Sequence, residues 1–398
     1  MGSDKFDVIV VGGGPAGSVS ARTAAQHGAK VLQIEEHTKI GNPIQCTGLL
    51  SVRGLEATGA SREIILREIT GAYVYAPDGR QLAVGGDRVH AYVINRDQLD
   101  QNLFKMAQGA GVQAREGVRA VRWSPGKLTV ATRAGKEETL HTPVVIGADG
   151  PHSVLAKEAK LPRPQKFTLG FQAVLPYEPP GRKDFVEVFI GKEMAPNFFG
   201  WAVPSVDGFG RVGLMTADWK NSRTYFQNML KARKLSTKII QFQSGVIPIG
   251  PSAKSVAAGL ILVGDATGHA KPTSGGGIFT SSTCAKIAGE VAAKCALLGK
   301  TSERALSEYD KRWRALLGNE LNLGMQAHKL MCALDDRQLN RIFAVLAEPE
   351  MTEIITRYGD IDYASRLALE LLKRPQLWGR LLSFLPSDVG TLVRMLRA

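Results

Sequence analysis

The strongest constraint on the fold lies at the start of the chain, where an apolar run ends in a cluster of glycines. Val8 to Val11 has the character of a buried parallel strand, and it leads directly into Gly12, Gly14 and Gly17. Between a strand and a helix, glycines at this spacing permit a tight turn, a close approach of backbone to a pyrophosphate, and close helix–strand packing. The glycines therefore predict a nucleotide-binding turn.

The segments after the glycines complete this unit. Residues 15–28 are rich in alanine and predict a helix whose N-terminal N–H groups and dipole face the phosphates. A second apolar strand, Val31 to Ile34, delivers Glu35 about 20 residues after the glycines, where a carboxylate can accept hydrogen bonds from a ribose hydroxyl. A glycine turn without a ligand is the alternative. Strand, glycines, helix, strand and acid occur in the required order, so we predict dinucleotide binding, with FAD and NAD both open.

The composition predicts a globular protein with a basic surface. The 398 residues suffice for more than one domain, and charged residues make up an ordinary 22%. An excess of 50 Lys and Arg over 37 Asp and Glu gives a net charge of +13. Such a charge favours an anionic membrane surface or a phosphorylated substrate, with a merely solvated surface as the alternative. No nucleic-acid-binding module is recognisable, so we expect no nucleic-acid partner.

The chain carries no recognisable targeting segment or metal motif. No apolar run reaches the ~18 residues that span a bilayer, and the first strand begins too close to Met1 for a signal peptide. We therefore expect a cytoplasmic location. The cysteines form no C-x-x-C pair, which argues against an iron–sulfur cluster, a structural zinc or any other metal site; they are Cys46, Cys284, Cys295 and Cys332.

Two kinds of pattern alternate along the chain and predict interleaved domains. Residues 1–165 and 251–300 carry the nucleotide-binding turn and further buried strands. Residues 166–250 contain short alternating runs typical of an antiparallel sheet, which we expect to bind substrate. Residues 301–398 have a helical pattern. We predict an α/β (α+β) fold with a discontinuous Rossmann-like nucleotide-binding domain, an inserted antiparallel-sheet domain and a helical C-terminal region.

Three separated motifs together suggest the cofactor. They are Gly12-x-Gly14-x-x-Gly17, Gly147-Ala-Asp149-Gly150 and Leu262-Val-Gly-Asp265-Ala266. This set resembles the FAD-binding fold of the p-hydroxybenzoate hydroxylase class. In that class an arginine lies near the ribityl–pyrophosphate and an aspartate binds the ribityl chain, and Arg96 and Asp265 match these residues.

The resemblance implies FAD, and the physical character of the residues agrees. A diphosphate carries about two negative charges, so an arginine and a helix N-terminus should both approach it. Residues 275–277 are glycines at a helix start, and their N–H groups suit the electron-rich edge of a reduced flavin. The predicted cofactor-binding residues are Gly12, Gly14, Pro15, Ala16, Gly17, Glu35, Glu36, Cys46, Gly48, Arg96, Asp149, Gly150, Asp265, Gly275, Gly276, Gly277 and Ile278.

Two further stretches resemble the geranylgeranyl reductase family. Pro43-Ile-Gln-Cys46-Thr-Gly48 and Lys271-Pro-Thr-Ser-Gly-Gly-Gly-Ile278 match family motifs, and Phe199-Gly-Trp201-Ala-Val-Pro204 keeps the register of a third with Gly213. The resemblance implies reduction of C=C bonds in polyprenyl chains of isoprenoid ether phospholipids or prenyl diphosphates. It also implies substrate contacts from Phe199, Trp201, Pro204 and Gly213. For the aromatic residues, ordinary core packing is the alternative.

Cys46 is the candidate catalytic residue. It lies in a loop rich in glycine and proline, and the resemblance puts it near the isoalloxazine. Its thiol could donate a proton or gate reduction through its redox state, whereas a small residue that shapes the loop is the alternative. His269 is a second candidate proton donor, with a structural histidine as the alternative.

The electron donor is open. No second Gly-x-Gly-x-x-Gly is present, so NADPH would bind transiently, or reduced ferredoxin or a deazaflavin would deliver electrons. A basic surface suits an acidic ferredoxin loosely. An FAD-dependent monooxygenase or halogenase, a quinone-linked electron-transfer flavoprotein and a lipid-binding flavoprotein without activity are the alternatives on the same fold.

The C-terminal stretch suggests a surface that contacts a membrane. Leucines between Leu367 and Leu385 alternate with Lys373, Arg374 and Arg380. Amphipathic basic helices of this kind can lie on the inner face of an anionic membrane, which predicts peripheral association. The alternative is that they cover the core of the sheet domain.

Overall fold

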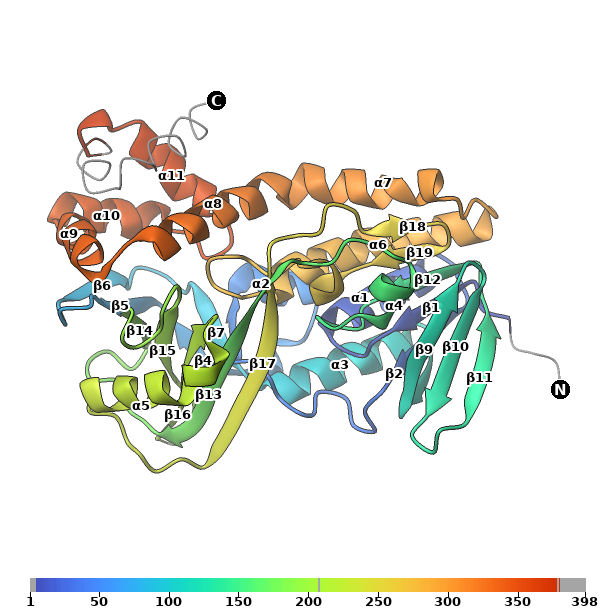
Figure 1. Ribbon diagram of the computed structural model, residues 1–398, viewed down its shortest axis with the longest axis horizontal. Helices are drawn as coiled ribbons and strands as arrows, with labels where there is room; N and C mark the ends of the chain where they lie inside the picture. The colour runs from blue at the N-terminus through green and yellow to red at the C-terminus, as the bar shows by residue number, and fades with distance from the viewer. Residues whose placement is uncertain (1–4, 207, 378, 380–398) are drawn as a thin grey trace.

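The computed structural model describes residues 5–377 except residue 207, together with residue 379. A six-stranded, mainly parallel sheet forms one half of the molecule (Figure 1). Val8 lies opposite both Val31 and Val144, which places the first strand in the middle of the sheet. The strand order is β18 (Val256–Ala257), β19 (Leu260–Leu262), β12 (Val144–Gly147), β1 (Val8–Val11), β2 (Val31–Glu35) and β8 (Gln113–Glu116).

Side chains alternate between the two faces of this sheet and bury a core on each. Val8 and Val10 pack against helices, whereas Ile9 and Val11 pack on the opposite side, toward a small antiparallel sheet. The helices are α1 (Pro15–Gln26), α3 (Arg96–Gly109), α6 (Ile278–Leu297) and α7 (Glu303–Trp313). The opposite layer is β9 (Val118–Ser124), β10 (Lys127–Thr132), β11 (Glu137–His141) and α4 (Val154–Glu158).

A seven-stranded sheet forms the other half (Figure 1). Its strand order is β17 (Gln241–Ile249), β13 (Lys166–Pro176), β16 (Phe209–Thr216), β15 (Phe199–Pro204), β14 (Phe185–Ile190), β5 (Gly71–Tyr75) and β6 (Gln81–Gly85). All neighbours are antiparallel except β14 and β5, where Phe185 lies opposite Gly71. The helix α5 (Ser222–Ala232) packs on one face through Phe226 and Met229.

The strands β5 and β6 come from outside the segment 166–250, to which the sequence pattern assigned this sheet. The predicted domain boundaries at 165 and 251 stay a proposal, and the sheet topology adds residues 71–85 to the second half. A smaller sheet joins the halves, with the strand order β3 (Leu49–Ser51), β7 (Ala91–Ile94) and β4 (Ile65–Ile69). Along the chain, α2 (Val52–Thr58) follows β3, and a short 3₁₀ turn, Arg62–Ile64, precedes β4.

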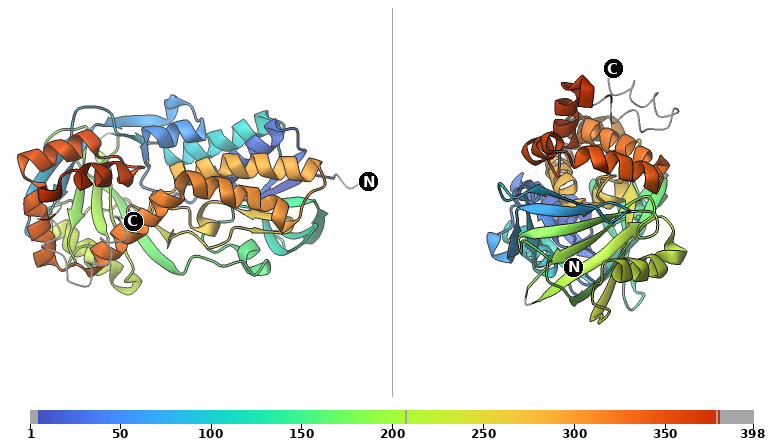
Figure 2. Two further views of the ribbon diagram at one scale, coloured as in Figure 1. Left: turned by 90° about the horizontal axis from the view of Figure 1, so that it is seen from above. Right: turned by 90° about the vertical axis from the view of Figure 1, so that its left-hand side faces the viewer.

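Helices after α7 run from the first sheet to the second, as Figure 1 and the left view of Figure 2 show. A π-helical turn, Arg314–Gly318, leads into α8 (Asn319–Ala333), followed by α9 (Asp336–Leu346), α10 (Pro349–Tyr358) and α11 (Ala364–Leu372). Thr356 of α10 accepts a hydrogen bond from the Gly85 N–H (3.2 Å), so these helices cover the edge of the second sheet.

The predicted fold class, with its parallel sheet, antiparallel sheets and helical C-terminal region, is confirmed. Part of the predicted amphipathic stretch, from Arg380 onward, lies outside the described residues. Among the helices that the structure describes, none is both long and apolar enough to cross a membrane.

Candidate functional site

A cavity of about 500 Å³ lies between the two halves of the molecule. One wall consists of the N-terminal turns of α1, α3 and α6, which follow β1, β7 and a glycine loop. The other wall is the face of the seven-stranded sheet opposite α5. The carboxyl ends of parallel strands, where such turns gather, are the usual ligand-binding edge of this kind of sheet.

The turn between β1 and α1 is tightly packed against the protein at Gly12 and Gly17, whereas at Gly14 it borders open space. A Cβ at Gly12, whose φ is +113°, would lie 2.2 Å from the Ala148 carbonyl oxygen, and one at Gly17 would lie 2.0 Å from the Gly12 carbonyl oxygen. A Cβ at Gly14 would meet no atom within 4 Å. The backbone at Gly14 is therefore free to approach a ligand.

Three helices begin at the cavity without a side-chain cap. Their N-cap residues are Gly14 for α1, Asn95 for α3 and Gly277 for α6, and none makes a side-chain capping hydrogen bond. Uncapped N-termini leave backbone N–H groups and the positive ends of helix dipoles available to an anion. The convergence of three such ends suits a ligand with a diphosphate.

Arg96, the first residue of α3, brings a positive charge to the same place. It forms an ion pair with Asp100, and both side chains are largely buried. Burial is the largest single influence on Arg96 and would lower the pKa of its guanidinium. The interactions with Asp100 and Cys46 together outweigh burial, so the pKa is raised. Burial raises the pKa of Asp100, although Arg96 opposes the rise. Nε of Arg96 is buried and has no hydrogen-bond partner among the described residues, so a donor remains for a ligand.

Asp149 and Gly150 lie at the end of β12. The Asp149 Oδ2 accepts a hydrogen bond from the Leu155 N–H (3.1 Å), while its buried Oδ1 has no partner among the described residues. Burial raises the pKa of Asp149. Gly150 lines the cavity with φ +75°, and a Cβ there would meet no atom within 4 Å. Gly150 therefore borders open space, and the Asp149 Oδ1 is an acceptor without a donor.

Asp265 follows β19 in a short 3₁₀ turn, Gly264–Thr267, and lines the cavity. Burial raises the pKa of Asp265 to about 6. A protonated carboxyl can donate a hydrogen bond as well as accept one. Asp265 can therefore pair with a hydroxyl in either role near neutral pH.

The two predicted acids at the end of β2 differ in their surroundings. Glu35 accepts hydrogen bonds from the Gly13 N–H (2.7 Å) and from the His37 N–H (2.9 Å), which holds its carboxylate behind the glycine turn. Glu36 is exposed. Neither residue lines the cavity.

The glycine loop before α6 is fixed by its own backbone. The Gly275 N–H donates to the Lys271 carbonyl oxygen (2.8 Å), and the Lys271 N–H donates to the Gly276 carbonyl oxygen (3.1 Å). The Gly276 N–H makes only a long contact, 3.4 Å, with the Ser274 hydroxyl. Of the three predicted glycine donors, that of Gly275 is thus already engaged.

Cys46 lies half-buried on the cavity wall. Its Sγ accepts a hydrogen bond from the Gly48 N–H (3.4 Å). Arg211 of β16 donates to the Thr47 carbonyl oxygen (2.7 Å), and a Cβ at Gly48 would lie 2.6 Å from the Arg211 Nη1. The loop around Cys46 is therefore held against the second sheet, close to a second guanidinium that the sequence reasoning missed.

A polar chain leads from this loop into the second sheet. The Thr47 hydroxyl donates to the Gln172 Oε1, and the Gln172 Nε2 donates to the Gln243 Oε1, both at 2.8 Å. Both glutamines are buried and line the cavity. Glutamine at an inward-facing position of a predicted strand, as in β13, is a signal that could have identified Gln172.

The rest of the sheet face on the cavity is apolar. The register puts Trp201 opposite Gly213 and Phe199 beside it, with ring centroids of Phe199 and Trp201 6.1 Å apart. Nε1 of Trp201 is buried without a partner among the described residues. Of the predicted substrate residues, Phe199 and Trp201 line the cavity, whereas Pro204 and Gly213 do not. A Cβ at Gly213 would lie 2.4 Å from the Gln172 Cβ, so this glycine permits close strand packing.

His269 lies away from the cavity wall. Its ring is fully buried and packs edge-on against Trp313, with the ring centroids 4.7 Å apart, and its Nδ1 lies 3.2 Å from the Gly264 N–H. Burial lowers the pKa of His269 to about 3. A neutral, enclosed imidazole fits the structural alternative better than proton donation to a substrate.

Taken together, these residues fit a flavin dinucleotide. The free Nε of Arg96 and the open space at Gly14 and Gly150 match the needs of a diphosphate, whereas Asp149 does not line the cavity. Beyond them, a largely apolar wall extends from the glycine loop across the second sheet. The arrangement can hold a redox cofactor at one end of the cavity and an apolar substrate at the other.

Comparison with known proteins bears on this site. Residues 5–318 match the family described as FAD binding domain. The chain is 31% identical to digeranylgeranylglycerophospholipid reductase 2 of Methanothermobacter thermautotrophicus, over 88% of this chain and 94% of that protein. It is 32% identical to digeranylgeranylglycerophospholipid reductase of Methanocaldococcus jannaschii, over 87% of this chain and 92% of that protein.

Solved structures share the fold. A geranylgeranyl bacteriochlorophyll reductase-like protein from Thermoplasma acidophilum superposes with a TM-score of 0.85 at 23% identity, covering 96% of this chain and 100% of that one. The flavin-dependent halogenase CmlS superposes with a TM-score of 0.65 at 18% identity, covering 93% of this chain and 70% of that one. At these identities the likeness concerns the fold alone.

Proposed function

The chain belongs to the geranylgeranyl reductase family of FAD-binding proteins, and we propose that it saturates C=C bonds of polyprenyl chains. The substrate class would be geranylgeranyl chains of isoprenoid ether phospholipids or of prenyl diphosphates. The observation that carries this proposal is the continuity of the cavity, whose wall changes from diphosphate-binding turns to an apolar sheet face.

The residues of the first half would hold FAD. The turn at Gly14 and the Arg96 guanidinium would bind the diphosphate, and Asp265 would bind the ribityl chain. The N-terminus of α6, after the glycine loop, would face the isoalloxazine edge. Bound there and reduced, FAD supplies a hydride.

The second half would align the alkene. An isolated C=C bond has no carbonyl to stabilise developing charge, so reduction demands close alignment of one alkene carbon and exclusion of water. Val186, Val203 and Met215 surround Phe199 and Trp201 on the cavity wall. These apolar side chains would bind a hydrocarbon chain and keep water from the reacting carbon.

Cys46 would supply the proton for the other alkene carbon. Its thiol lines the cavity between the apolar sheet face and the turns of the first half. The hydrogen bond from the Gly48 N–H to its Sγ fixes the direction of the side chain. The chain through Thr47, Gln172 and Gln243 would help to hold the loop in register with the sheet.

The partners follow from the same proposal. Reduced ferredoxin, a deazaflavin or NADPH would reduce the flavin. The relatives named for digeranylgeranylglycerophospholipid reduction act on a lipid, so we propose peripheral contact of the C-terminal region with the inner face of the membrane.

An anaerobic turnover experiment tests the function. The purified holoprotein is reduced with dithionite and mixed with geranylgeranyl phospholipid or geranylgeranyl diphosphate, and the products are analysed by mass spectrometry. We expect a stepwise gain of hydrogen pairs together with reoxidation of the flavin. The same lipid with fully saturated chains is the control and should leave the flavin reduced.

The opposite result would identify a different reaction. If neither lipid gains hydrogen and the flavin reoxidises only with oxygen, prenyl reduction is wrong. Substrate-dependent oxygen consumption would then favour a monooxygenase or halogenase, and reoxidation by a quinone would favour an electron-transfer flavoprotein.

A further inference from the structure

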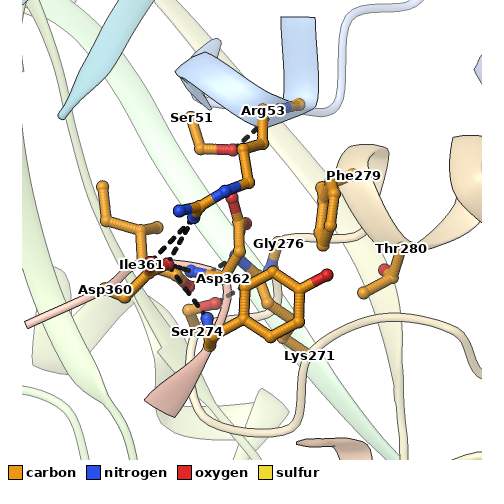
Figure 3. Close-up of polar contacts among 12 residues, drawn as sticks. Ser51, Arg53, Lys271, Ser274, Gly276, Phe279, Thr280, Asp360, Ile361 and Asp362 are labelled. Carbon is orange, nitrogen blue, oxygen red and sulfur yellow. Dashed lines mark hydrogen bonds and ion pairs between the residues drawn. The ribbon is translucent and has the colours of Figure 1, made fainter. Parts of the chain in front are cut away.

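The loop between α10 and α11 reaches across to the cavity and forms part of its wall. Ile361 and Asp362 line the cavity next to the glycine loop, although α10, which precedes them, packs on β6 of the second sheet. Figure 3 shows the loop residues Asp360, Ile361 and Asp362 facing Lys271, Ser274 and Gly276. The loop therefore contacts the part of the site that would face the isoalloxazine.

Lys271 and Asp362 make the inner contact. The Lys271 Nζ lies 2.8 Å from the Asp362 Oδ1 and also donates to the Ile361 carbonyl oxygen at 2.8 Å. The Asp362 side chain is only 1% exposed and that of Lys271 13%. A pair so enclosed is weakly screened, and removal of either charge leaves the other without its ion-pair partner.

Lys271 also fixes the glycine loop. Its carbonyl oxygen and N–H hold Gly275 and Gly276 by the backbone hydrogen bonds described above. A Cβ at Gly276 would lie 3.8 Å from the Lys271 Nζ, so the ammonium group stands directly beside the loop. One residue thus joins the loop to the C-terminal region through both its backbone and its side chain.

Arg53 and Asp360 make an outer contact (Figure 3). The Arg53 Nη1 lies 2.8 Å from both carboxylate oxygens of Asp360. Asp360 also accepts hydrogen bonds from the N–H groups of Asp362 (2.9 Å) and Tyr363 (3.1 Å), which fixes the turn that presents Asp362. Tyr363 packs edge-on against Phe279, in the first turn of α6, with ring centroids 5.7 Å apart. The outer contact therefore supports the inner one.

Asp362 has an unused acceptor. Its Oδ2 is buried and has no partner among the described residues. A second carboxylate oxygen without a donor is costly unless the charge is compensated nearby. Lys271 provides that compensation, which leaves the pair with no net charge at the edge of the flavin site.

We propose that Asp362 is a positioning residue for the flavin and acts through Lys271. The Lys271–Asp362 pair fixes the glycine loop, and the loop between α10 and α11 retains the cofactor at that end of the cavity. The pair also balances two opposite charges beside the flavin, so that neither charge alone biases its reduction. This inference rests on FAD as the cofactor and not on prenyl reduction, so the two fail separately.

Cofactor release in the absence of any lipid tests retention. FAD dissociation from the holoprotein is followed by fluorescence in the variants Asp362→Asn and Lys271→Met, and in the exchange Lys271→Asp with Asp362→Lys. We expect each single variant to release FAD about tenfold faster or more, because a buried charge loses its partner. The exchange should restore most of the retention.

The matched control is Glu370→Gln. Glu370 of α11 pairs with Lys373 (2.6 Å) and Arg374 (3.2 Å), which follow the helix, away from the cavity wall. This variant should release FAD at the rate of the unchanged protein. Single variants that retain FAD as the control does would overturn the proposal. Should either single variant fail to fold, the exchange decides, since restored folding and retention support the pair and their absence contradicts it.

The reduction potential separates an electrostatic role from loosened packing. Reduction adds negative charge to the flavin, so Asp362→Asn should favour the reduced state and Lys271→Met should disfavour it. We expect opposite changes of about tenfold in the preference for reduced over oxidised FAD, or about 30 mV each for a two-electron couple. Shifts in the same direction, or none, would overturn the charge-balance role.

Discussion

Gly17 lies against the carbonyl oxygen of Gly12, so closely that a Cβ at Gly17 would stand 2.0 Å from that oxygen. This contact presses the first turn of α1 onto the end of β1. Gly14, only three residues earlier, faces open space. Two glycines of one motif thus have different physical reasons to be glycine.

Alanine at these two positions should therefore impair different properties, stability at Gly17 and FAD binding at Gly14. We expect Gly17→Ala to lower the free energy of unfolding of the FAD-free protein by about 1–3 kcal/mol or more, since the backbone must move. Gly14→Ala should leave that stability within about 0.5 kcal/mol and weaken FAD binding. Urea unfolding and FAD titration of both variants check this. Undiminished FAD affinity of Gly14→Ala would contradict the assignment of this turn to the diphosphate.

Asp265 predicts a pH dependence of stability for the FAD-free protein. Burial raises its pKa in the fold to about 6 from 3.8, so the folded protein holds this proton more tightly than the unfolded chain. The resulting stabilisation is full below the unfolded value and is lost as the pH rises through about 6, a change of about 3 kcal/mol.

The difference between the protein and Asp265→Asn isolates this effect. Urea unfolding of both from pH 3.5 to 7.5, an interval of about 4 units that brackets the two pKa values, should show the free energy of unfolding of the protein fall relative to that of Asp265→Asn as the carboxyl ionises. His269 contributes the opposite slope, because burial lowers its pKa to about 3, but it is present in both proteins. A difference that stays constant across the range would show that Asp265 titrates normally.

Trp201→Ala should impair turnover and leave cofactor binding intact. The Trp201 ring lies on the apolar sheet face, and its removal would loosen the alignment of the alkene. We expect kcat/KM for a geranylgeranyl lipid to fall about 10- to 100-fold. Phe209→Ala in the neighbouring strand β16 is the control, since Phe209 is exposed and does not line the cavity. Equal effects of the two substitutions would argue against a substrate-binding role for Trp201.

Substitution of Cys46 should distinguish proton donation from loop shape. If the thiol donates the proton, Cys46→Ala lowers the rate of prenyl reduction by about 10²- to 10⁴-fold with FAD bound normally, as loss of a general acid does. Cys46→Ser keeps a hydroxyl of similar size and should recover part of the rate. Rapid-mixing measurements of flavin reoxidation by the lipid report this step. Near-normal rates in both variants would leave Cys46 as a residue that shapes the loop.

Local pattern was enough to predict several strands of each large sheet. The apolar run before Gly12 is β1, and the predicted strand Val31 to Ile34 is β2, which extends one residue further to Glu35. Short-range periodicity carries such information because it reflects which side of a strand is buried. Phe199 and Trp201, for which the family resemblance implied substrate contacts, both line the cavity.

Pairings between distant segments were beyond that reasoning. Nothing local indicates that β5 will pair with β14, or that Arg211 will hold the carbonyl of Thr47. The pattern of residues 359–362 is typical of a surface turn. Asp362 nevertheless forms an ion pair with Lys271, 91 residues away in the chain. Tertiary packing decides which charged residues form an ion pair, and from the sequence alone many oppositely charged residues are equally plausible partners.

The parallel pairing of β5 with β14 limits which chain segments can be exchanged between related proteins to make chimeras. The second sheet is continuous in space but is assembled from two pieces of chain, 71–85 and 166–249, with much of the nucleotide-binding half encoded between them. Residues 166–250 therefore do not form a transplantable module. A chimera that imports this segment alone would combine its edge strand with a foreign β5, and substrate preference should transfer only when both pieces move together.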